Sequence, residues 1–531
     1  MKSLFKAVAL ITFFSILTRI AGFFFRIYLS RTIGAEALGI YQVSFSIFMV
    51  LLTLVASGLP LIISRNTAKY ISIGDKKGEK GMMTSSLIFA LVTSLLVCAL
   101  AFAFKGVLSK IFTDERCINI LIILLPALVF SAIYSVFRGW MWGKNNYFCV
   151  CVTELFEQIA RILICVIMLS GTFTVMDGAT VAGVSMSIAC LLSCIVALVL
   201  FFAIGGKLGK ATKPWQDTIK PSVPITLVRL ATSLIQPVIA IIIPLRLVAA
   251  GWTNAQAISI YGIAVGMTLP FLFVPSAIVG SLSMALIPDL STANAKNDTN
   301  YIQNRITTSL VFSLFVSALF VPLYIGCGEL VGTFFYNNIQ SGALLASSAW
   351  LMIPIGLTNV TSSILNALGY EVKSLKNYIL GAVLLLVSIW FLPKYVGINA
   401  LVWGMGICMS IASLLNIRMI KKITNAKLNF FKPFVVICLI ILPVCAIVSF
   451  VSSILANFFT LFFALAISCT LGAVCFVLLC LVFKVIDLDW FVKLVPKKSG
   501  ATKITGFNIF KKIRLPKILF FKQKRKTKQL Y

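Results

Sequence analysis

Apolar stretches of about 20 residues recur along the whole chain and leave little sequence from which a soluble core could form. The chain has 531 residues, of which 60% are hydrophobic and only 11% are charged. Soluble domains are nearer to about 45–50% apolar and about 25% charged. Because an α-helix of about 20 residues crosses a bilayer, the sequence predicts an all-α, polytopic membrane protein.

Hydropathy predicts fourteen membrane-spanning helices, arranged as two six-helix lobes followed by two further helices. Their expected limits are 4–29, 39–64, 82–104, 117–137, 147–170, 178–204, 222–246, 257–287, 306–328, 342–369, 377–393, 398–417, 433–453 and 457–484. The expected parts of the chain are an N-lobe (1–205), a loop between the lobes (206–221), a C-lobe (222–422), the two added helices (423–485) and a basic tail (486–531).

Lysine and arginine placement predicts the orientation of the chain. Counted together with the span ends Lys6 and Lys484, the N-terminus, alternate loops and tail hold 36 of the 46 lysines and arginines, and the opposite loops, counted with the span end Arg246, hold six. Basic loops stay on the cytoplasmic side. We therefore expect a multi-pass protein of the bacterial cytoplasmic membrane with both termini in the cytoplasm.

The net charge of +31 reflects these loops and the tail, and it needs no nucleic acid as a partner. The tail alternates basic and apolar residues, as a segment on anionic lipid would; a solvated, disordered end is the alternative. The chain has 14 cysteines, no histidine and no CxxC pair. We therefore expect neither a metal site nor a cofactor.

Two arginines interrupt the first apolar span, and a third stands at a similar place in the seventh. "ILTRIAG" at 16–22 resembles "TLVRLAT" at 226–232, which suggests that the two lobes are repeats. Arg19 and Arg26 are seven residues apart and share a helical face. An arginine at the bilayer centre costs about 2.5–3.5 kcal/mol on insertion scales. We expect Arg19 and Arg229 to line a hydrated cleft between the lobes, whereas Arg26 is near the outer end of its span and can reach the lipid headgroups.

The fifth span carries both signs of charge. Glu154, Glu157 and Arg161 fall on one stripe, and the spacing of Glu157 and Arg161 predicts an ion pair between them. Such a pair either helps the helix to insert or contacts a substrate or coupling ion. Both interpretations stay open.

A guanidinium group binds phosphate through two parallel hydrogen bonds and keeps its charge. The arginines therefore favour an amphiphile with a phosphate or pyrophosphate head and a lipid tail, bound by Arg19, Arg26, Arg161 and Arg229. The alternative is that Arg19 pairs with a carboxylate or with backbone carbonyls and only holds helices together.

Prolines interrupt several spans, and prolines kink membrane helices by freeing backbone carbonyls. They favour helices that bend as two lobes rock. The candidate hinge residues are Pro60, Pro237, Pro244, Pro270 and Pro275.

Several motifs resemble one family of transporters. "RIAGFFFRIYLSRTIGAEALGIYQ" (19–42) and "SGLPLIISRNTAKY" (57–70) are similar to the opening of the stage V sporulation protein B group. "ELFEQIARIL" (154–163) and "IPIGLTNVTSSILNALGYEVKSLKN" (353–377) resemble the same group. It lies in the polysaccharide-transporter and MurJ-like branch of the multidrug/oligosaccharidyl-lipid/polysaccharide exporter superfamily.

The resemblance implies a flippase, not an enzyme, for an undecaprenyl-linked sugar such as lipid II or a polysaccharide repeat unit. It also implies alternating access coupled to the membrane potential, Na⁺ or H⁺. Arg19 matches the cavity arginine of the MurJ pattern, but Phe25-Arg26 stands where that pattern has an arginine–aspartate pair. This departure favours the sporulation-protein or polysaccharide-transporter branch over lipid II specificity.

Partners implied at this point are the lipid-linked sugar and enzymes of cell-wall or polysaccharide synthesis, and we expect a monomer. Three other functions remain: a cation-coupled drug antiporter of the same superfamily, a membrane glycosyltransferase, and a scaffold that does not transport. The outer loops are too short for the catalytic carboxylates that such a transferase needs.

Overall fold

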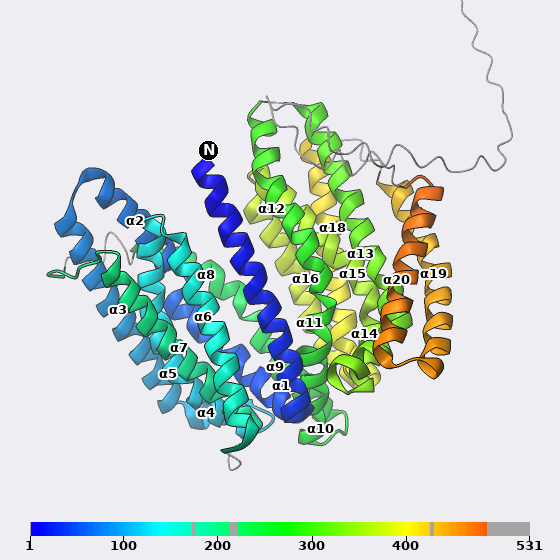
Figure 1. Cartoon of the computed structure of the whole chain (residues 1–531), viewed down its shortest axis with the longest axis horizontal. Helices are drawn as coiled ribbons and strands as arrows, with labels where there is room; N and C mark the ends of the chain where they lie inside the picture. The colour runs from blue at the N-terminus through cyan, green and yellow to red at the C-terminus, as the bar shows by residue number, and fades with distance from the viewer. Residues whose placement is uncertain (1, 173–176, 212–219, 297, 425–429, 486–531) are drawn as a thin grey trace, which may run out of the picture. The chain divides into compact units, whose positions relative to one another are not determined.

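Long apolar helices make up nearly all of the computed structural model (Figure 1). It describes residues 2–172, 177–211, 220–296, 298–424 and 430–485. The expected tail, 486–531, lies outside the described residues, and so does half of the expected loop between the lobes, residues 212–219. In the described part of the chain, 12 helices are long and apolar enough to cross a membrane.

Two further observations account for the difference between 12 and the fourteen predicted spans. The first helix, α1 (Lys2–Ala56), is two helices merged across Gly34, whose φ of 79° breaks the helical backbone. A further helix, α6 (Tyr147–Ile167), has the length of a span but carries three charged side chains. Each predicted span thus coincides with a helix, and the chain is a multi-pass membrane protein.

The first half of the chain forms one group of packed helices. Its other members are α2 (Leu59–Ile73), α3 (Lys76–Ala103), α4 (Lys105–Ile111), α5 (Arg116–Gly143), the π-helix η1 (Met168–Thr172) and α7 (Gly178–Ala203). Helix α5 lies at the centre and contacts α1, α2, α3 and α7. Its buried residues include Trp140 and Phe137, whose rings pack on Phe201 of α7.

The second half forms another group. Its elements are α8 (Lys220–Ser233), α9 (Ile235–Ala249), α10 (Asn254–Tyr261), η3 (Gly262–Thr268), α11 (Leu269–Leu272), α12 (Val274–Ala295), α13 (Thr299–Tyr336), α14 (Ile339–Ser348), η4 (Ala349–Leu351), α15 (Met352–Ala367), α16 (Glu371–Phe391), α17 (Pro393–Val396) and α18 (Asn399–Thr424). The last two helices, α19 (Phe431–Phe458) and α20 (Leu461–Val482), pack on α13.

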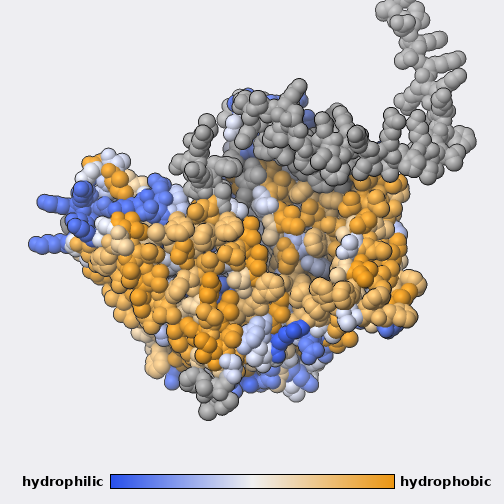
Figure 2. Space-filling model, viewed as in Figure 1, coloured by the Kyte–Doolittle hydropathy of each residue, from blue (hydrophilic) through white to orange (hydrophobic). Residues whose placement is uncertain are grey.

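On the face of the bundle that Figure 2 shows, apolar residues cover the middle and hydrophilic residues lie toward the two ends. The N-terminus lies at one end, and α10 lies at the other (Figure 1). This division is the one expected of spans that cross a bilayer. It does not itself say which end faces the cytoplasm, so the predicted orientation stays a prediction.

Four of the five candidate hinge prolines stand just after a break between helices. Pro60 is the second residue of α2, and Pro270 and Pro275 occupy first-turn positions of α11 and α12. Pro237 is the third residue of α9, which follows the break at Leu234. A first-turn proline lacks only an N–H that the helix leaves unpaired. Pro244, by contrast, lies inside α9.

Helix α1 is the element through which the two halves of the chain mainly touch. It packs on α5, α6 and α7, and it also contacts α8, α9, α10, η3 and α13. In Figure 1 its first half runs from the N-terminus between the two groups of helices. Movement of either group against the other must therefore change the surroundings of α1.

The tightest contact between the halves is a backbone approach of α1 to α10 and η3. A Cβ on Gly39 would overlap the carbonyl oxygen of Ile258, and a Cβ on Gly262 would overlap that of Ala35. Leu38 and Ile258 are buried beside this contact. Small residues at helix interfaces let backbones approach in this way.

Replacing Gly39 with alanine should therefore weaken the contact between the halves, because backbone has to move to make room. We expect a loss of about 1–3 kcal/mol, the usual cost of overpacking, measured as a lower melting temperature of the purified protein. The control is Gly280→Ala in α12, since a Cβ there meets nothing within 4 Å. Equal melting temperatures for the two variants would contradict the tight contact.

Candidate substrate-binding site

The side chain of Arg26 lies where both halves of the chain meet. It is exposed, and its electrostatic neighbours are Tyr41 of the second half of α1, Tyr336 at the end of α13, and Arg161 of α6. Arg26 is seven residues before Ile33, the last residue before the bend in α1, or about 10 Å along the helix axis. The site thus lies well inside the span, toward the end of the bundle that carries α10.

Arg161 is held by neutral groups. Its Nη2 donates to Gln158 Oε1, its Nη1 lies 3.2 Å from Met186 Sδ, and its guanidinium carbon is 5.9 Å from the centre of the Phe25 ring. Within the described residues no carboxylate lies within ion-pair distance of Arg26 or Arg161. Two positive groups therefore share this part of the membrane region without a countercharge.

Three buried hydrogen-bond donors, one on Arg161 itself and two beside the arginines, lack an acceptor in the described part of the chain. They are Arg161 Nε, Gln158 Nε2 and the Tyr336 hydroxyl. Buried polar groups in native proteins are nearly always hydrogen-bonded, so each such exception needs an explanation. Donors without acceptors, next to unbalanced positive charge, are what an anionic ligand would satisfy.

The predicted ion pair between Glu157 and Arg161 is wrong. Glu157 Oε2 instead accepts a hydrogen bond of 3.1 Å from Ser193 Oγ of α7. The i, i+4 spacing made the pair possible, but neighbouring helices offer each side chain a different partner. The two residues therefore do not neutralise one another.

Glu154 does form an ion pair, with a residue that the sequence reasoning missed. Arg138 Nη1 of α5 lies 3.2 Å from Glu154 Oε1, and the Arg138 guanidinium stacks 4.7 Å from the Trp142 ring. Arg138 precedes Glu154 by 16 residues, so no helical spacing within α6 signals the pair. The acidic side chains of α6 are thus bound to α5 and α7.

The two arginines that the repeat suggested as equivalents have different surroundings. Arg229 is exposed, and its Nη1 donates to the backbone oxygen of Ser57 at 2.7 Å. Ser57 O is available because the helix breaks between α1 and α2. Arg19 is exposed too, and no hydrogen bond or ion pair engages it among the residues described. Arg229 therefore links α8 to the α1–α2 break, which is the structural alternative foreseen for Arg19.

The end of the bundle beyond Arg26 is closed by further contacts between the halves. Arg31 Nε donates to Phe335 O at 2.7 Å, and its Nη2 donates to Phe334 O. These carbonyls lie in the last turn of α13, where a helix carries partial negative charge. Phe23 packs on Phe271 with ring centres 4.9 Å apart. These contacts form a closed seam beside the Arg26 site.

Sequence reasoning found Arg26 and Arg161, and Gln158 as a lesser polar candidate, but it did not place Tyr41 and Tyr336 beside Arg26. Tyr41 follows Ile40 as Tyr261 follows Ile260 in the second half, and this shared pair was a weak signal. Tyr336 is 310 residues from Arg26, and nothing local in the sequence brings the two together. Among the described residues no three or more His, Cys, Asp or Glu side chains gather as a metal site would need.

Comparison with known proteins places the chain in a family. The model of the polysaccharide biosynthesis protein family matches residues 4–294. The chain is 26% identical to stage V sporulation protein B of Bacillus subtilis (strain 168), over 69% of this chain and 73% of that one. It is 21% identical to the lipid II flippase MurJ of the same organism, over 72% and 76%.

Solved structures show the same fold. A lipid II flippase MurJ in an inward closed conformation matches with a TM-score of 0.66 and 14% identity, over 90% of this chain and 98% of that one. An inward-facing multidrug resistance MATE transporter of the MOP superfamily matches with a TM-score of 0.62 and 16% identity, over 77% and 95%. Since the family model covers more than half of the sequence, the chain belongs to the polysaccharide biosynthesis protein family.

Proposed function

We propose that the chain is a flippase for an undecaprenyl-(pyro)phosphate-linked sugar, either a peptidoglycan precursor such as lipid II or a polysaccharide repeat unit. It acts by alternating access across the bacterial cytoplasmic membrane, with both termini in the cytoplasm. The observation that carries the proposal is the pair Arg26 and Arg161, two guanidinium groups without a carboxylate partner in the described residues.

An anionic headgroup would supply what this site lacks. Phosphate oxygens accept from guanidinium groups through short, charge-assisted hydrogen bonds. They would also accept from Gln158 Nε2 and the Tyr336 hydroxyl after a small movement of these side chains. Arg19, two turns away on the same helix, extends the positive face along which the headgroup moves.

Alternating access fits the way in which α1 joins the two halves. Arg26 lies on α1, Arg161 on α6 and Tyr336 on α13, so the site contains residues from both halves. When the closed seam at Arg31 and the contact at Gly39 both open, Tyr336 moves away from Arg26 and the headgroup is released on that side. The driving force is the membrane potential or a gradient of Na⁺ or H⁺, and enzymes of cell-wall or polysaccharide synthesis supply the substrate.

A drug antiporter is the second candidate, because the chain shares its fold with a multidrug transporter. A cationic drug needs carboxylates that are free to bind it. Glu154 is paired with Arg138, and Glu157 binds Ser193. The charge around Arg26 would repel a cation. These contacts favour an anionic substrate, and the named relatives favour a transporter over a glycosyltransferase.

The arginine pair gives a direct prediction for transport. Arg26→Ala and Arg161→Ala should each lower flipping about tenfold or more, because a charge-assisted hydrogen bond contributes about 1.5–3 kcal/mol. The measurement is protection of a lipid-linked sugar in vesicles, normalised to inserted protein. Arg418→Ala, which removes an exposed arginine of α18, is the matched control. Full transport by the Arg26→Ala protein would overturn the role of Arg26 in binding the headgroup, and absence of transport by the wild-type protein would overturn the proposed function.

The Arg31 contact gives a second prediction. Arg31→Ala removes two hydrogen bonds between the halves, so the closed seam should open more often. Spin labels at Thr32 and Ile339, both exposed, report the separation of the two elements by pulsed electron resonance. We expect a larger population at long distance than in wild type.

Lys394→Ala, at an exposed residue of α17, should leave that distance distribution unchanged. If Arg31→Ala also leaves it unchanged, the Arg31 contacts do not hold the seam closed.

A further inference from the structure

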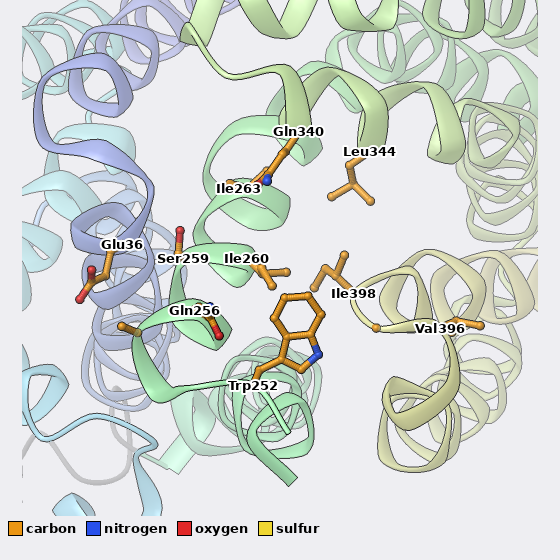
Figure 3. A pocket seen from close by; sticks show the side chains of 12 residues that line it. Glu36, Trp252, Gln256, Ser259, Ile260, Ile263, Gln340, Leu344, Val396 and Ile398 are labelled. Atoms are coloured by element: carbon orange, nitrogen blue, oxygen red, sulfur yellow. The ribbon is translucent and has the colours of Figure 1, made fainter. Parts of the chain in front are cut away.

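A cavity lies at the end of the bundle opposite the N-terminus, beside the closed seam. Its volume is about 630 Å³, within the range of about 300–1,000 Å³ that small-molecule sites occupy. Figure 3 shows the side chains around it, which come from α1, the connection between α9 and α10, α10, η3, α14 and the segment that begins in α17. Both halves of the chain therefore contribute to its wall.

Trp252 dominates the interior of this cavity. Its ring projects into the middle of the group, between Gln256 and Ile398 (Figure 3). The side chain is 42% exposed although the ring is large and apolar. Part of the indole surface is thus available for an apolar ligand face to pack on.

Polar groups stand around the indole with free hydrogen-bonding capacity. The side chains of Ser259 and Gln340 make no hydrogen bond within the part of the chain that the structure describes, and neither does the indole N–H of Trp252. Gln256 uses its Oε1 to accept from the backbone N–H of Thr253, at 3.1 Å, which leaves its amide donors free. A primary amide offers donors and an acceptor in one plane, which suits neighbouring hydroxyl groups.

The charge at the rim of the cavity argues against a phosphate. None of the lining residues is a lysine or an arginine. Glu36 is paired with Arg116, which also binds Asp114 at 2.7 Å. Partial burial alone would raise the pKa of Asp114, but the hydrogen bonds and charge of Arg116 hold it below its ordinary value. Two carboxylates, Glu36 at the rim and Asp114 beyond it, therefore surround the single Arg116 guanidinium.

Other ligand classes fit less well. A quaternary ammonium group is held by a cage of several aromatic rings, and Trp252 is the one aromatic residue in the lining. A purely apolar ligand would leave the amides and the hydroxyl unpaired. A neutral ligand with an apolar face and many hydroxyls satisfies both the ring and the amides.

We propose that this cavity is a saccharide-binding site, in which a neutral sugar ring stacks on Trp252 and its hydroxyls bond to Gln256, Ser259 and Gln340. The assignment rests on the proposed function, because the expected orientation places the cavity on the outer side, where the sugar emerges. The sugar comes either from the lipid-linked substrate or from soluble saccharide outside the cell.

The test measures sugar binding directly and does not depend on transport. The full chain is placed in nanodiscs of phosphatidylethanolamine and phosphatidylglycerol, and saturation-transfer NMR reports binding of N-acetylglucosamine. Trp252→Ala should weaken binding about tenfold or more, since the stacking surface is lost. Gln340→Leu should weaken it too, because it removes hydrogen-bonding groups at nearly constant volume.

Trp403→Ala is the matched control, because Trp403 is 53% exposed and does not line the cavity. No saturation transfer to the sugar, or equal transfer with wild type and Trp252→Ala, would overturn the assignment. Either result would leave Trp252 as an aromatic side chain at the membrane interface. Stronger binding of inorganic phosphate than of the sugar at this cavity would overturn it as well.

Competition by a short-chain polyprenyl-pyrophosphoryl N-acetylglucosamine separates the two sources. Displacement of the free sugar assigns the cavity to the substrate headgroup, and lack of displacement assigns it to soluble saccharide. The two proposals also fail in different ways. Sugar binding at Trp252 without flipping by the wild-type protein contradicts the proposed function alone, and flipping by the wild-type protein without sugar binding at Trp252 contradicts the saccharide site alone.

Discussion

Positive charge without a countercharge, held inside an apolar bundle, is the constraint on which this account depends. A charged side chain in a membrane span is expensive and is usually paired or functional. Arg26 and Arg161 are near each other, and the acidic residues of α6 are bound to Arg138 and Ser193. The protein thus directs its carboxylates away from the arginines. Binding of an anion beside Arg26 and Arg161 would therefore lower the energy of the helix bundle.

The bent helix α1 connects this charge to the motion that transport requires. Its first half carries Arg19 and Arg26, and its second half packs on η3 through Gly39 and Gly262. A π-helix is a frequent feature of functional sites, and η3 lies at this contact. Because one helix carries the charge and also forms the seam, opening of the seam and release of a headgroup are coupled by the covalent chain. Rocking of two halves around a site between them is a common plan for transporters.

The sequence predicts the spans well because hydropathy and charge act locally along each helix. The bend at Gly34 is local too and falls in the gap between the first two predicted spans, and Pro60, Pro270 and Pro275 were visible as interruptions of spans. The partner that each charged side chain binds, by contrast, is not set by local sequence. Spacing within α6 favoured Glu157 with Arg161, but Ser193 and Arg138 lie on neighbouring helices whose rotation no local pattern reveals. The contact of Arg229 with Ser57 O likewise depends on a helix break 172 residues away.

The central claim is that the arginines recognise the charge of a headgroup. Native mass spectrometry of the full chain with a polyprenyl phosphate and with the matching uncharged polyprenol tests it most directly. We predict that wild type binds the phosphate more tightly than the alcohol, and that Arg26→Ala with Arg161→Ala removes this preference while binding of the alcohol is kept. Equal binding of the two lipids by wild type would contradict the account.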